Sequence, residues 1–205
     1  MVLAYHIIFG AYGFWLPNDP RGSWSDFVWA WELARFGPAR HTNARHSLAH
    51  IPHDHAARLA AKAALLRPAV VFNGLQGRAI ARGFADAATR GRYRVLACSI
   101  LPEHVHMVVG RHPQRTIEYI GCHLKGRASK FLADENLHPF QNEVGRRRKR
   151  PSPWGESFWQ VFLDSRDGIH AACVYVENNP LKEGRRPQAW HFVTPRFARR
   201  AEESV

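Results

Sequence analysis

The chain has 205 residues, 45% of them hydrophobic, which suits one globular domain with insertions or at most two small domains. Its 29 Lys and Arg residues outnumber 17 Asp and Glu residues, and the net charge of +12 favours an anionic polymer such as a nucleic acid as partner. The widely spaced Cys98, Cys122 and Cys173 exclude a disulfide framework and predict a reduced, cytoplasmic protein, and no run is apolar enough for a transmembrane helix.

The N-terminal part of the chain predicts one strand followed by an insertion. Its start lacks the basic region and cleavage site of a signal peptide, so we expect none. Residues 3–11 instead predict a strand, because Tyr5, Ile7 and Phe9 alternate along it. An aromatic, proline-containing loop follows, and the Trp- and His-rich segment 26–55 predicts an inserted excursion whose role the sequence leaves open.

The middle of the chain predicts two helical pieces and a hairpin. A helix is predicted over residues 54–66, and a second helical piece over 70–89 is interrupted near Asn73-Gly74. Residues 92–101 and 104–110 are rich in β-branched side chains and are separated by a short Pro-Glu turn. These two strands are therefore expected to pair as a hairpin.

The last part of the chain predicts two helices and one more strand. Helical spacing extends over residues 113–132, and the apolar stretch 157–163 reads as a strand. A final helix is predicted over 165–179, where Ser165 caps its start and Pro180 ends it.

The order of these elements predicts the fold. It runs strand, helix, strand, strand, helix, strand, helix, and the first six elements match the split βαβ plan. We therefore predict an α+β fold, a ferredoxin-like βαββαβ sandwich with an additional C-terminal helix. The expected domain spans residues 1–185, and residues 186–205 form a basic C-terminal tail.

A His-Val-His sequence lies on the second strand of the predicted hairpin. Because side chains alternate across a strand, His104 and His106 point to the same face. Val105, Val108 and Val109 surround them, which indicates a central strand on which polar groups need a partner or a role. Two imidazoles on one face can bind one divalent metal ion, although two surface histidines on a half-buried strand would give the same pattern.

The last predicted helix carries a tyrosine and an asparagine one turn apart. Tyr175 and Asn179 project from the same face. If that face packs over the histidines, Asn179 offers an oxygen as third ligand to Mg²⁺ or Mn²⁺, and Tyr175 offers a phenolate that can attack a phosphate. The alternative is a core tyrosine on an amphipathic helix, with Tyr119 as the rival nucleophile.

Further basic and aromatic residues are candidates for contact with nucleic acid. The histidine cluster over 41–55 matches no zinc-finger spacing, and the tryptophans near residues 15–31 would either stack on unpaired bases or bury the insertion. Basic residues on the helix over 113–132 and in the following loop are candidate phosphate contacts, although such charges are often only solvated. These candidate contacts are Lys125, Arg127, Lys130, Arg146, Arg147, Arg148, Lys149 and Arg150.

Five stretches of the sequence occur in an order that resembles a known family. The chain is similar to insertion-sequence transposases of the single-tyrosine HUH type, closest to the REP-associated tyrosine transposases, over about residues 3–185. The histidine strand with its preceding Leu-Pro-Glu and the Tyr-x-x-x-Asn-Pro ending are the most specific stretches. All five are YHIIFGAYGFWLPNDPRG, LPEHVHMVV, IGCHLKGRASKFL, SFWQVFL and YVENNPLKEG.

The resemblance implies a role for each of these motifs. It makes Tyr175 the nucleophile, and His104, His106 and Asn179 the ligands of Mg²⁺ or Mn²⁺. It implies metal-dependent cleavage and rejoining of single-stranded, hairpin-containing DNA through a 5′-phosphotyrosine intermediate. The family includes monomers and homodimers, and the sequence does not choose between them. The competing interpretations are a non-catalytic module that binds single-stranded nucleic acid and an HUH replication initiator or relaxase.

Overall fold

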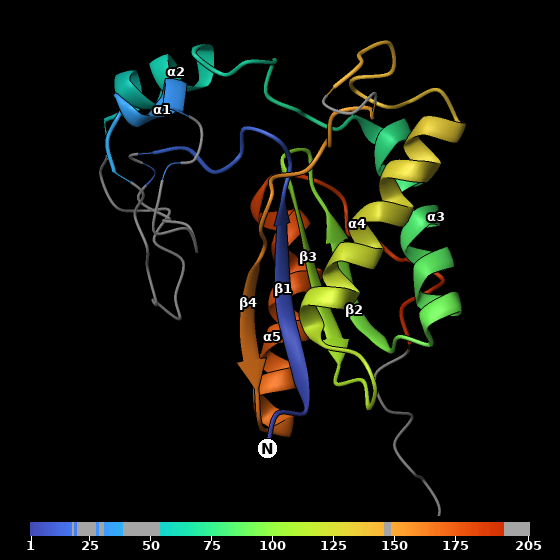
Figure 1. Ribbon diagram of the computed structural model, residues 1–205. Helices are drawn as coiled ribbons and strands as arrows, with labels where there is room; N and C mark the ends of the chain where they lie inside the picture. The colour runs from blue at the N-terminus through green and yellow to red at the C-terminus, as the bar shows by residue number, and fades with distance from the viewer. Residues whose placement is uncertain (18, 20–27, 29–30, 39–53, 146–148, 195–205) are drawn as a thin grey trace, which may run out of the picture.

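The computed structural model describes the whole chain except residues 18, 20–27, 29–30, 39–53, 146–148 and 195–205 (Figure 1). The predicted histidine cluster and most of the insertion therefore lie outside the described residues. In chain order the described elements are β1 (Ala4–Gly10), α1 (Trp31–Ala34), α2 (His55–Ala63), α3 (Gly74–Gly91), β2 (Val95–Ile100), β3 (His104–Gly110), α4 (Ile117–Asp134), β4 (Trp159–Leu163) and α5 (Arg166–Lys182).

The four strands form one antiparallel sheet in the order β2-β3-β1-β4. β2 and β3 are the predicted hairpin, closed where the Leu101 N–H donates to the His104 carbonyl at 2.8 Å. β1 and β3 are the two central strands, and α3 (between β1 and β2) and α4 (between β3 and β4) connect strands that follow one another in the sequence but are not neighbours in the sheet. This topology confirms the predicted α+β, ferredoxin-like βαββαβ plan with an additional C-terminal helix.

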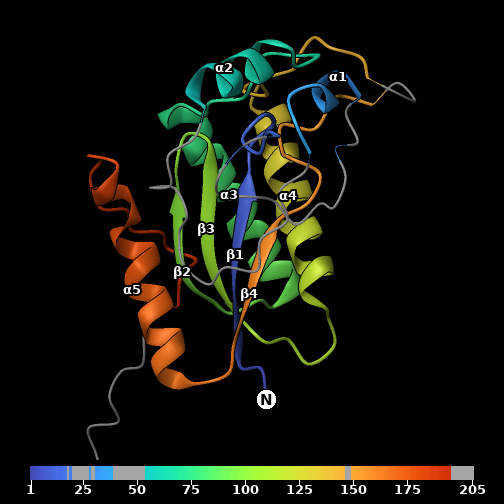
Figure 2. The same cartoon turned by 90° about the vertical axis from the view of Figure 1, so that its left-hand side faces the viewer.

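The helices divide between the two faces of the sheet. Figure 2 shows α5 alone on one face and α3 with α4 on the other, while α1 and α2 lie beyond one end of the strands. Alternation along the strands matches this division, because Ile7 and Met107 belong to the main core under α3 and α4. Val108 packs instead with Cys173 and Val176 of α5 in a second, smaller core. Residues on β3 with even numbers therefore face α5.

Two helix ends differ from the prediction for clear physical reasons. Asn73 does not interrupt a helix but begins α3, since its side chain accepts hydrogen bonds from the N–H groups of Leu75 and Gln76. Pro180 lies inside α5, which continues to Lys182. A proline is tolerated there because only two helical residues follow it, so the one backbone hydrogen bond that it removes lies near the end of the helix.

Part of the predicted basic tail packs on the sheet. The side chain of Gln188 both donates to and accepts from the backbone of Ile100, each at 2.8 Å, and the Thr194 N–H donates to the Val95 carbonyl at 2.8 Å. Trp190 and Phe192 pack against the main core between these anchors. This segment covers the outer edge of β2, which would otherwise be open to strand pairing. None of the described helices is long and apolar enough to cross a membrane.

Candidate active site

His104 and His106 lie on β3 and face α5, as the alternation of the strand predicts. Their ring centroids are 4.9 Å apart and the rings are nearly perpendicular, at 77°. His106 is buried at 5% exposure, in the middle of the sheet. His104 begins the strand, stacks on the ring of Phe14 at 4.7 Å, and places its Nε2 3.9 Å from Oε1 of Glu183. The two imidazoles therefore form a polar spot on a face whose core is otherwise built from apolar residues such as Val108, Cys173 and Val176.

A third histidine, His6 of β1, joins this pair and was not predicted from the sequence. Its Nε2 lies 3.0 Å from Nδ1 of His106, a hydrogen-bond distance, and the two ring centroids are 5.3 Å apart. The signal was present in the alternation of the strand. Since Ile7 and Phe9 face the main core, His6 must face the opposite side together with the His-Val-His pair.

Tyr175 comes to the same spot from α5. Its ring centroid lies 5.6 Å from that of His106 and 5.8 Å from that of His6, in edge-to-face arrangements. Cys173 and Val176, both fully buried on neighbouring positions, anchor this part of the helix to the sheet. The packing of α5 thus holds the phenol ring over the central strands.

Asn179 lies between the two ends of the histidine pair. Tyr175 contacts His106, and Glu183 lies beside His104 two turns later, so Asn179, one turn from each, projects over the space between the histidines. Its side chain is buried at 6% exposure, and its Nδ2 has no hydrogen-bond partner. Because a buried amide without a partner is costly, this orphaned group fits a site that holds a ligand.

A second orphaned polar group lies on the other side of His106. Ser99 of β2 pairs with His106 in the register of the hairpin, so both side chains share the face covered by α5. The Ser99 hydroxyl is fully buried, and its Oγ has no hydrogen-bond partner. Two buried polar groups without hydrogen-bond partners, Ser99 on the sheet and Asn179 on α5, thus lie on the face of the sheet that carries His106, which is typical of a binding site rather than of a structural core.

Burial controls the ionisation of the site. It lowers the pKa of His6 to about 4, and, together with the neighbouring His104, His6 and Lys182, it lowers the pKa of His106 well below its usual range. Both rings are therefore neutral at pH 7, the state in which imidazole binds a metal. Burial, with a smaller contribution from the Glu183 carboxylate, raises the pKa of Tyr175.

The side chains of this site could hold a divalent cation if Asn179 joins the two histidines as a ligand. Among the residues that the structure describes, no group of three or more His, Cys, Asp or Glu side chains is arranged to hold a metal ion. His104 and His106 would supply two imidazoles and Asn179 its side-chain oxygen, whereas the Asn179 atom without a partner, Nδ2, is a donor that suits an acceptor on a bound ligand. Two nitrogen ligands with one oxygen ligand suit Mn²⁺, or Mg²⁺ with water completing its shell.

The rival nucleophile, Tyr119, lies far from the histidines. It is on α4, on the opposite face of the sheet from α5, and 48% of its surface is exposed. The Arg115 guanidinium covers its ring at 4.6 Å from the centroid. The sheet therefore separates Tyr119 from His104 and His106, and the structure brings only Tyr175 to them.

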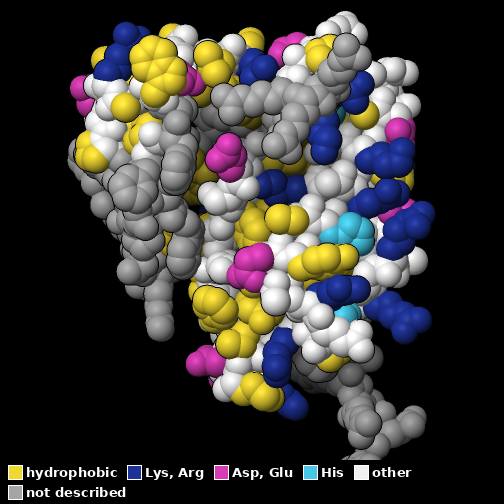
Figure 3. All heavy atoms as spheres, in the orientation of Figure 1, with side chains coloured by type: hydrophobic (Ala, Val, Ile, Leu, Met, Phe, Trp, Pro, Cys, Tyr) yellow, Lys and Arg dark blue, Asp and Glu magenta, His cyan; other side chains and the backbone are white. Residues whose placement is uncertain are grey.

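Basic side chains gather on the face opposite to the histidine site. Figure 3 shows dark blue side chains over α3 and α4, the helices that lie across the sheet from α5. Of the loop arginines predicted to bind DNA, Arg146, Arg147 and Arg148 lie outside the described residues. Lys149 and Arg150 are exposed, and the Arg150 Nε donates to the Gln141 carbonyl at 3.3 Å. DNA contact by this loop stays a prediction.

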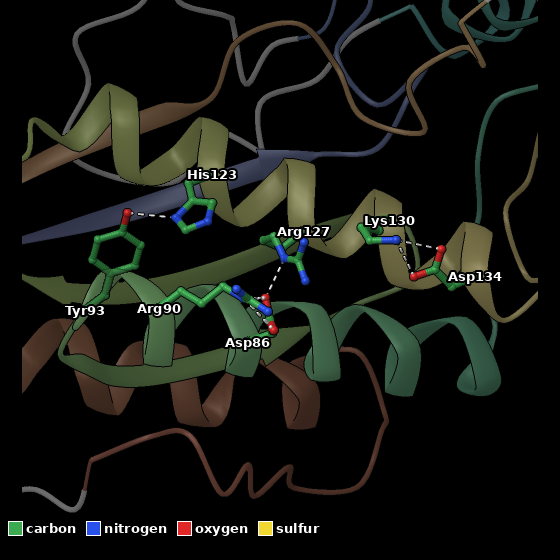
Figure 4. Close-up of polar contacts among 7 residues, drawn as sticks. All are labelled: Asp86, Arg90, Tyr93, His123, Arg127, Lys130 and Asp134. Atoms are coloured by element: carbon green, nitrogen blue, oxygen red, sulfur yellow. Dashed lines mark hydrogen bonds and ion pairs between the residues drawn. The ribbon is translucent and has the colours of Figure 1, made fainter.

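Two of the predicted phosphate contacts on α4 are paired with acidic residues. In Figure 4, Asp86 of α3 lies between Arg90 and Arg127 and receives hydrogen bonds from both guanidinium groups. Lys130 pairs with Asp134 one turn later at 2.8 Å. These pairs partly neutralise the charge that Arg127 and Lys130 offer to DNA.

Lys125 occupies a different environment from the one predicted. It is buried at 8% exposure, and its ammonium group donates to the backbone carbonyls of Gly155 and Glu156 at 2.6 and 3.1 Å. It thereby fixes the loop that leads into β4. A phosphate contact at Lys125 would require these hydrogen bonds to break, and the predicted DNA role for this residue has no geometric support in the free protein.

No protein-family model and no curated protein matches the sequence. Two solved structures are similar to the chain in the arrangement of their elements. A REP-associated tyrosine transposase bound to a REP hairpin has a TM-score of 0.46 and 11% sequence identity, and the match covers 89% of this chain and 68% of that one. A candidate transposase from Deinococcus radiodurans R1 has a TM-score of 0.38 and 15% identity, over 87% of this chain and 91% of that one. These similarities concern the fold, so a functional assignment rests on the residues of the site.

Proposed function

We propose that this chain is a transposase of the single-tyrosine HUH type, a metal-dependent enzyme that cuts and rejoins single-stranded DNA through Tyr175. One observation carries the proposal: the Tyr175 ring lies 5.6 Å from that of His106, on the face of the sheet that also carries His104, and the buried Asn179 follows one turn later on the same helix. The net charge of +12 supports a DNA substrate. The sequence resemblance supports single-stranded, hairpin-containing DNA in particular.

In the proposed reaction the Tyr175 oxygen attacks a backbone phosphorus in line with its bond to the 3′ oxygen. The bond between phosphorus and the 3′ oxygen breaks, and that oxygen takes up a proton and leaves as a hydroxyl. The phosphate stays on the tyrosine as a 5′-phosphotyrosine diester. A 3′ hydroxyl of another strand then attacks this diester, joins the two DNA ends and releases the tyrosine. Each step exchanges one phosphate ester for another, so no outside energy source is required.

The side chains of the site divide the remaining tasks. His104, His106 and Asn179 would hold a divalent ion, which when bound neutralises the non-bridging oxygens of the phosphate. The protein keeps His106 neutral by burial and so leaves it ready to bind a cation. Because burial raises the pKa of Tyr175, its phenolate needs positive charge nearby, and the Lys182 ammonium lies 4.3 Å from the centroid of the tyrosine ring.

The decisive experiment is a search for the covalent intermediate. The purified protein is incubated with labelled single-stranded hairpin DNA and Mn²⁺, and a denaturing gel separates the protein-linked fragment that carries the 5′ phosphate. We expect an adduct that disappears with a chelator and with Tyr175→Phe, while Tyr175→Phe still binds the DNA. Tyr119→Phe, on the far face of the sheet, is the matched control and should form the adduct normally.

Two outcomes would overturn the proposal. An adduct that persists in Tyr175→Phe would place the nucleophile elsewhere. Chelator-insensitive binding without cleavage of any hairpin substrate would instead identify a non-catalytic module that binds single-stranded nucleic acid. A replication initiator or relaxase would nick DNA by the same chemistry, and a test for joining of the adduct to a second DNA end separates strand transfer from nicking alone.

A further inference from the structure

His6 lies outside the expected ligand set, but it is the direct hydrogen-bond partner of one expected ligand. Its Nε2 is 3.0 Å from Nδ1 of His106. Among the residues that the structure describes, no other hydrogen bond involves either imidazole, and the other contacts of the His106 ring are with the rings of His104 and Tyr175. The hydrogen bond between His6 and His106 therefore decides how the ring of His106 is oriented and where its proton resides.

The strand register places His6 and His104 on opposite sides of His106. His6 pairs with Val108, two residues after His106, whereas His104 lies two residues before it. The Nδ1 edge of the His106 ring thus turns toward His6, and its Nε2 edge turns away from it. Only the Nε2 edge remains to bind a cation shared with His104.

The direction of this hydrogen bond then determines whether His106 can bind a cation at all. A neutral imidazole carries one N–H and one lone pair. If Nδ1 of His106 carries the hydrogen and donates it to His6, the lone pair is on Nε2. If His6 is the donor, Nε2 of His106 keeps its hydrogen and cannot bind a metal.

We propose that His6 is a positioning residue: by accepting the Nδ1 hydrogen of His106, it holds that ring in the tautomer whose Nε2 binds the divalent ion. This inference rests on the proposed function, since the metal site belongs to it. Histidine ligands in metal sites commonly donate their second N–H to such a partner, and removal of the partner typically weakens metal binding by about 10- to 100-fold. Here the partner is a neutral histidine, which accepts through its own lone pair.

The alternative is that His6 is itself a ligand. Two ligand atoms at right angles, each about 2.1 Å from an octahedral ion, are also about 3.0 Å apart. The opposite placement of His6 and His104 around His106 argues against it, because one ion cannot meet Nδ1 and Nε2 of the same ring. A direct test must therefore separate these two roles.

The test uses nitrogen NMR on metal-free protein labelled with ¹⁵N-histidine at pH 7.5, where the tautomer of each ring is read from its nitrogen shifts. We expect His106 to be protonated on Nδ1 in the wild-type protein and in His6→Gln, whose amide oxygen can accept the same hydrogen. In His6→Leu we expect the hydrogen to move to Nε2. Thermal unfolding of all three proteins checks that each is folded.

Metal titration supplies the second readout. We expect His6→Leu to bind Mn²⁺ about tenfold more weakly than the wild type and His6→Gln to restore most of the affinity. Addition of Zn²⁺ as a diamagnetic probe should shift Nε2 of His106 and leave the nitrogens of His6 nearly unchanged. A shift of His6 as large as that of His106 would make His6 a ligand and overturn the inference.

The outcomes distinguish this inference from the proposed function. His106 protonated on Nε2 in a wild-type protein that still forms the DNA adduct would refute the role of His6 alone. The expected tautomers and metal affinities without any DNA adduct would refute the strand-transfer proposal and leave His6 as the partner that orients His106.

Discussion

Lys125, a buried lysine on α4, stabilises a loop, although its charge suggests that it binds a ligand. Lys125 donates to backbone carbonyls of the loop before β4, and burial lowers its pKa. Hydrogen bonds from a charged donor contribute more than neutral ones, and here they are part-buried, so loss of the donor leaves part of their carbonyls without a partner. Lys125 therefore holds the entry into the edge strand that pairs with β1.

We expect Lys125→Met to lower the free energy of unfolding by about 2–3 kcal/mol, since methionine keeps the length of the side chain and removes the donor. Urea unfolding measures this change. Lys130→Met is the control, because Lys130 is more than half exposed and pairs only with Asp134 at the surface, so its change should stay within about 0.5 kcal/mol. Normal stability with weakened DNA binding in Lys125→Met would instead support the phosphate contact predicted from the sequence.

The two candidate tyrosines, on opposite faces of the sheet, have different surroundings. Tyr119 is exposed beneath an arginine, whereas Tyr175 is half-buried among two histidines and a lysine. The exposed Tyr119 lies near one histidine, His123, at 6.1 Å between ring centroids, and on the far face of the sheet from His104 and His106. Tyr175 has a raised pKa, and its activation depends on charge brought to the site. In the proposed reaction, this dependence would keep Tyr175 unreactive until a cation is bound.

At the scale of elements, the sheet is supported by a close crossing of α3 and α4. Gly83 faces α4 so closely that a Cβ added there would lie 2.5 Å from the Ala128 Cα, a backbone atom that cannot move independently. The two small residues thus set the distance between the helices. This contact buries the common apolar face of α3 and α4 against β1, β2 and β3.

We expect Gly83→Ala to destabilise the protein by about 1–3 kcal/mol, because the added methyl group forces the two helices apart. The matched control is Gly77→Ala on the same helix, where a Cβ would meet only Ile100 at 3.8 Å, an ordinary contact. That control should be neutral or stabilising by up to about 1 kcal/mol, since alanine favours the helix. Equal thermal shifts for the two variants would contradict a tight crossing at Gly83.

The elements also show what could be predicted from the sequence. Strand alternation and the turn before His104 suffice to predict the hairpin and the shared face of His104 and His106, because both depend on local periodicity. The start of α3 at Asn73 and the continuation of α5 through Pro180 depend on cap geometry, which local signals describe only ambiguously. The approach of α5 to the sheet follows from the small core around Cys173, a long-range contact.

His6 marks the limit of that prediction. Its face follows from the alternation of β1, but its contact with His106 depends on the pairing register of β1 with β3, which are far apart in the sequence. The environment of Lys125 depends in the same way on a loop thirty residues later. Spacing within one element predicts which side chains share a face, whereas partners across elements require the assembled fold.

At the scale of the whole molecule, buried neutral histidines couple stability to pH. Burial, with the Arg150 charge, lowers the pKa of His138 to about 4, and its Nδ1 accepts a hydrogen bond from the Phe140 N–H at 3.1 Å. In the unfolded chain the pKa of histidine is about 6.5. Between these two values the unfolded state binds a proton that the folded state does not, so stability falls as pH falls from about 6.5 to 4.

We expect His138 alone to cost about 3 kcal/mol of stability by pH 4, most of it lost below pH 6. Urea unfolding of the wild type and of His138→Gln at pH 7, 6, 5 and 4.5 measures the effect, and the difference between the two removes the contribution of the carboxylates. The stability of His138→Gln should depend less steeply on pH. Parallel curves for the two proteins would show that His138 has the same pKa in the folded and unfolded states.

The connection between β4 and α5 bears on whether the candidate tyrosine and histidines of one active site come from the same chain. Tyr175 lies beside the histidines of its own chain, and α5 follows β4 after only Asp164 and Ser165. Three residue steps span at most about 11 Å, so the first turn of α5 stays beside its own sheet. Its contacts with β2 and β3, through Cys173 and Val176, hold the rest of the helix there.

We therefore expect the nucleophile and the metal ligands to act within one chain. His106→Ala and Tyr175→Phe should each fail to form the DNA adduct, and a mixture of the two variants, unfolded and refolded together, should fail equally. If two chains exchanged their last helices, the mixture would contain sites with an intact tyrosine from one chain and intact histidines from the other. Recovery of up to about a quarter of the wild-type adduct would reveal such an exchange, because half of the chains would pair as mixed dimers with one complete site of two.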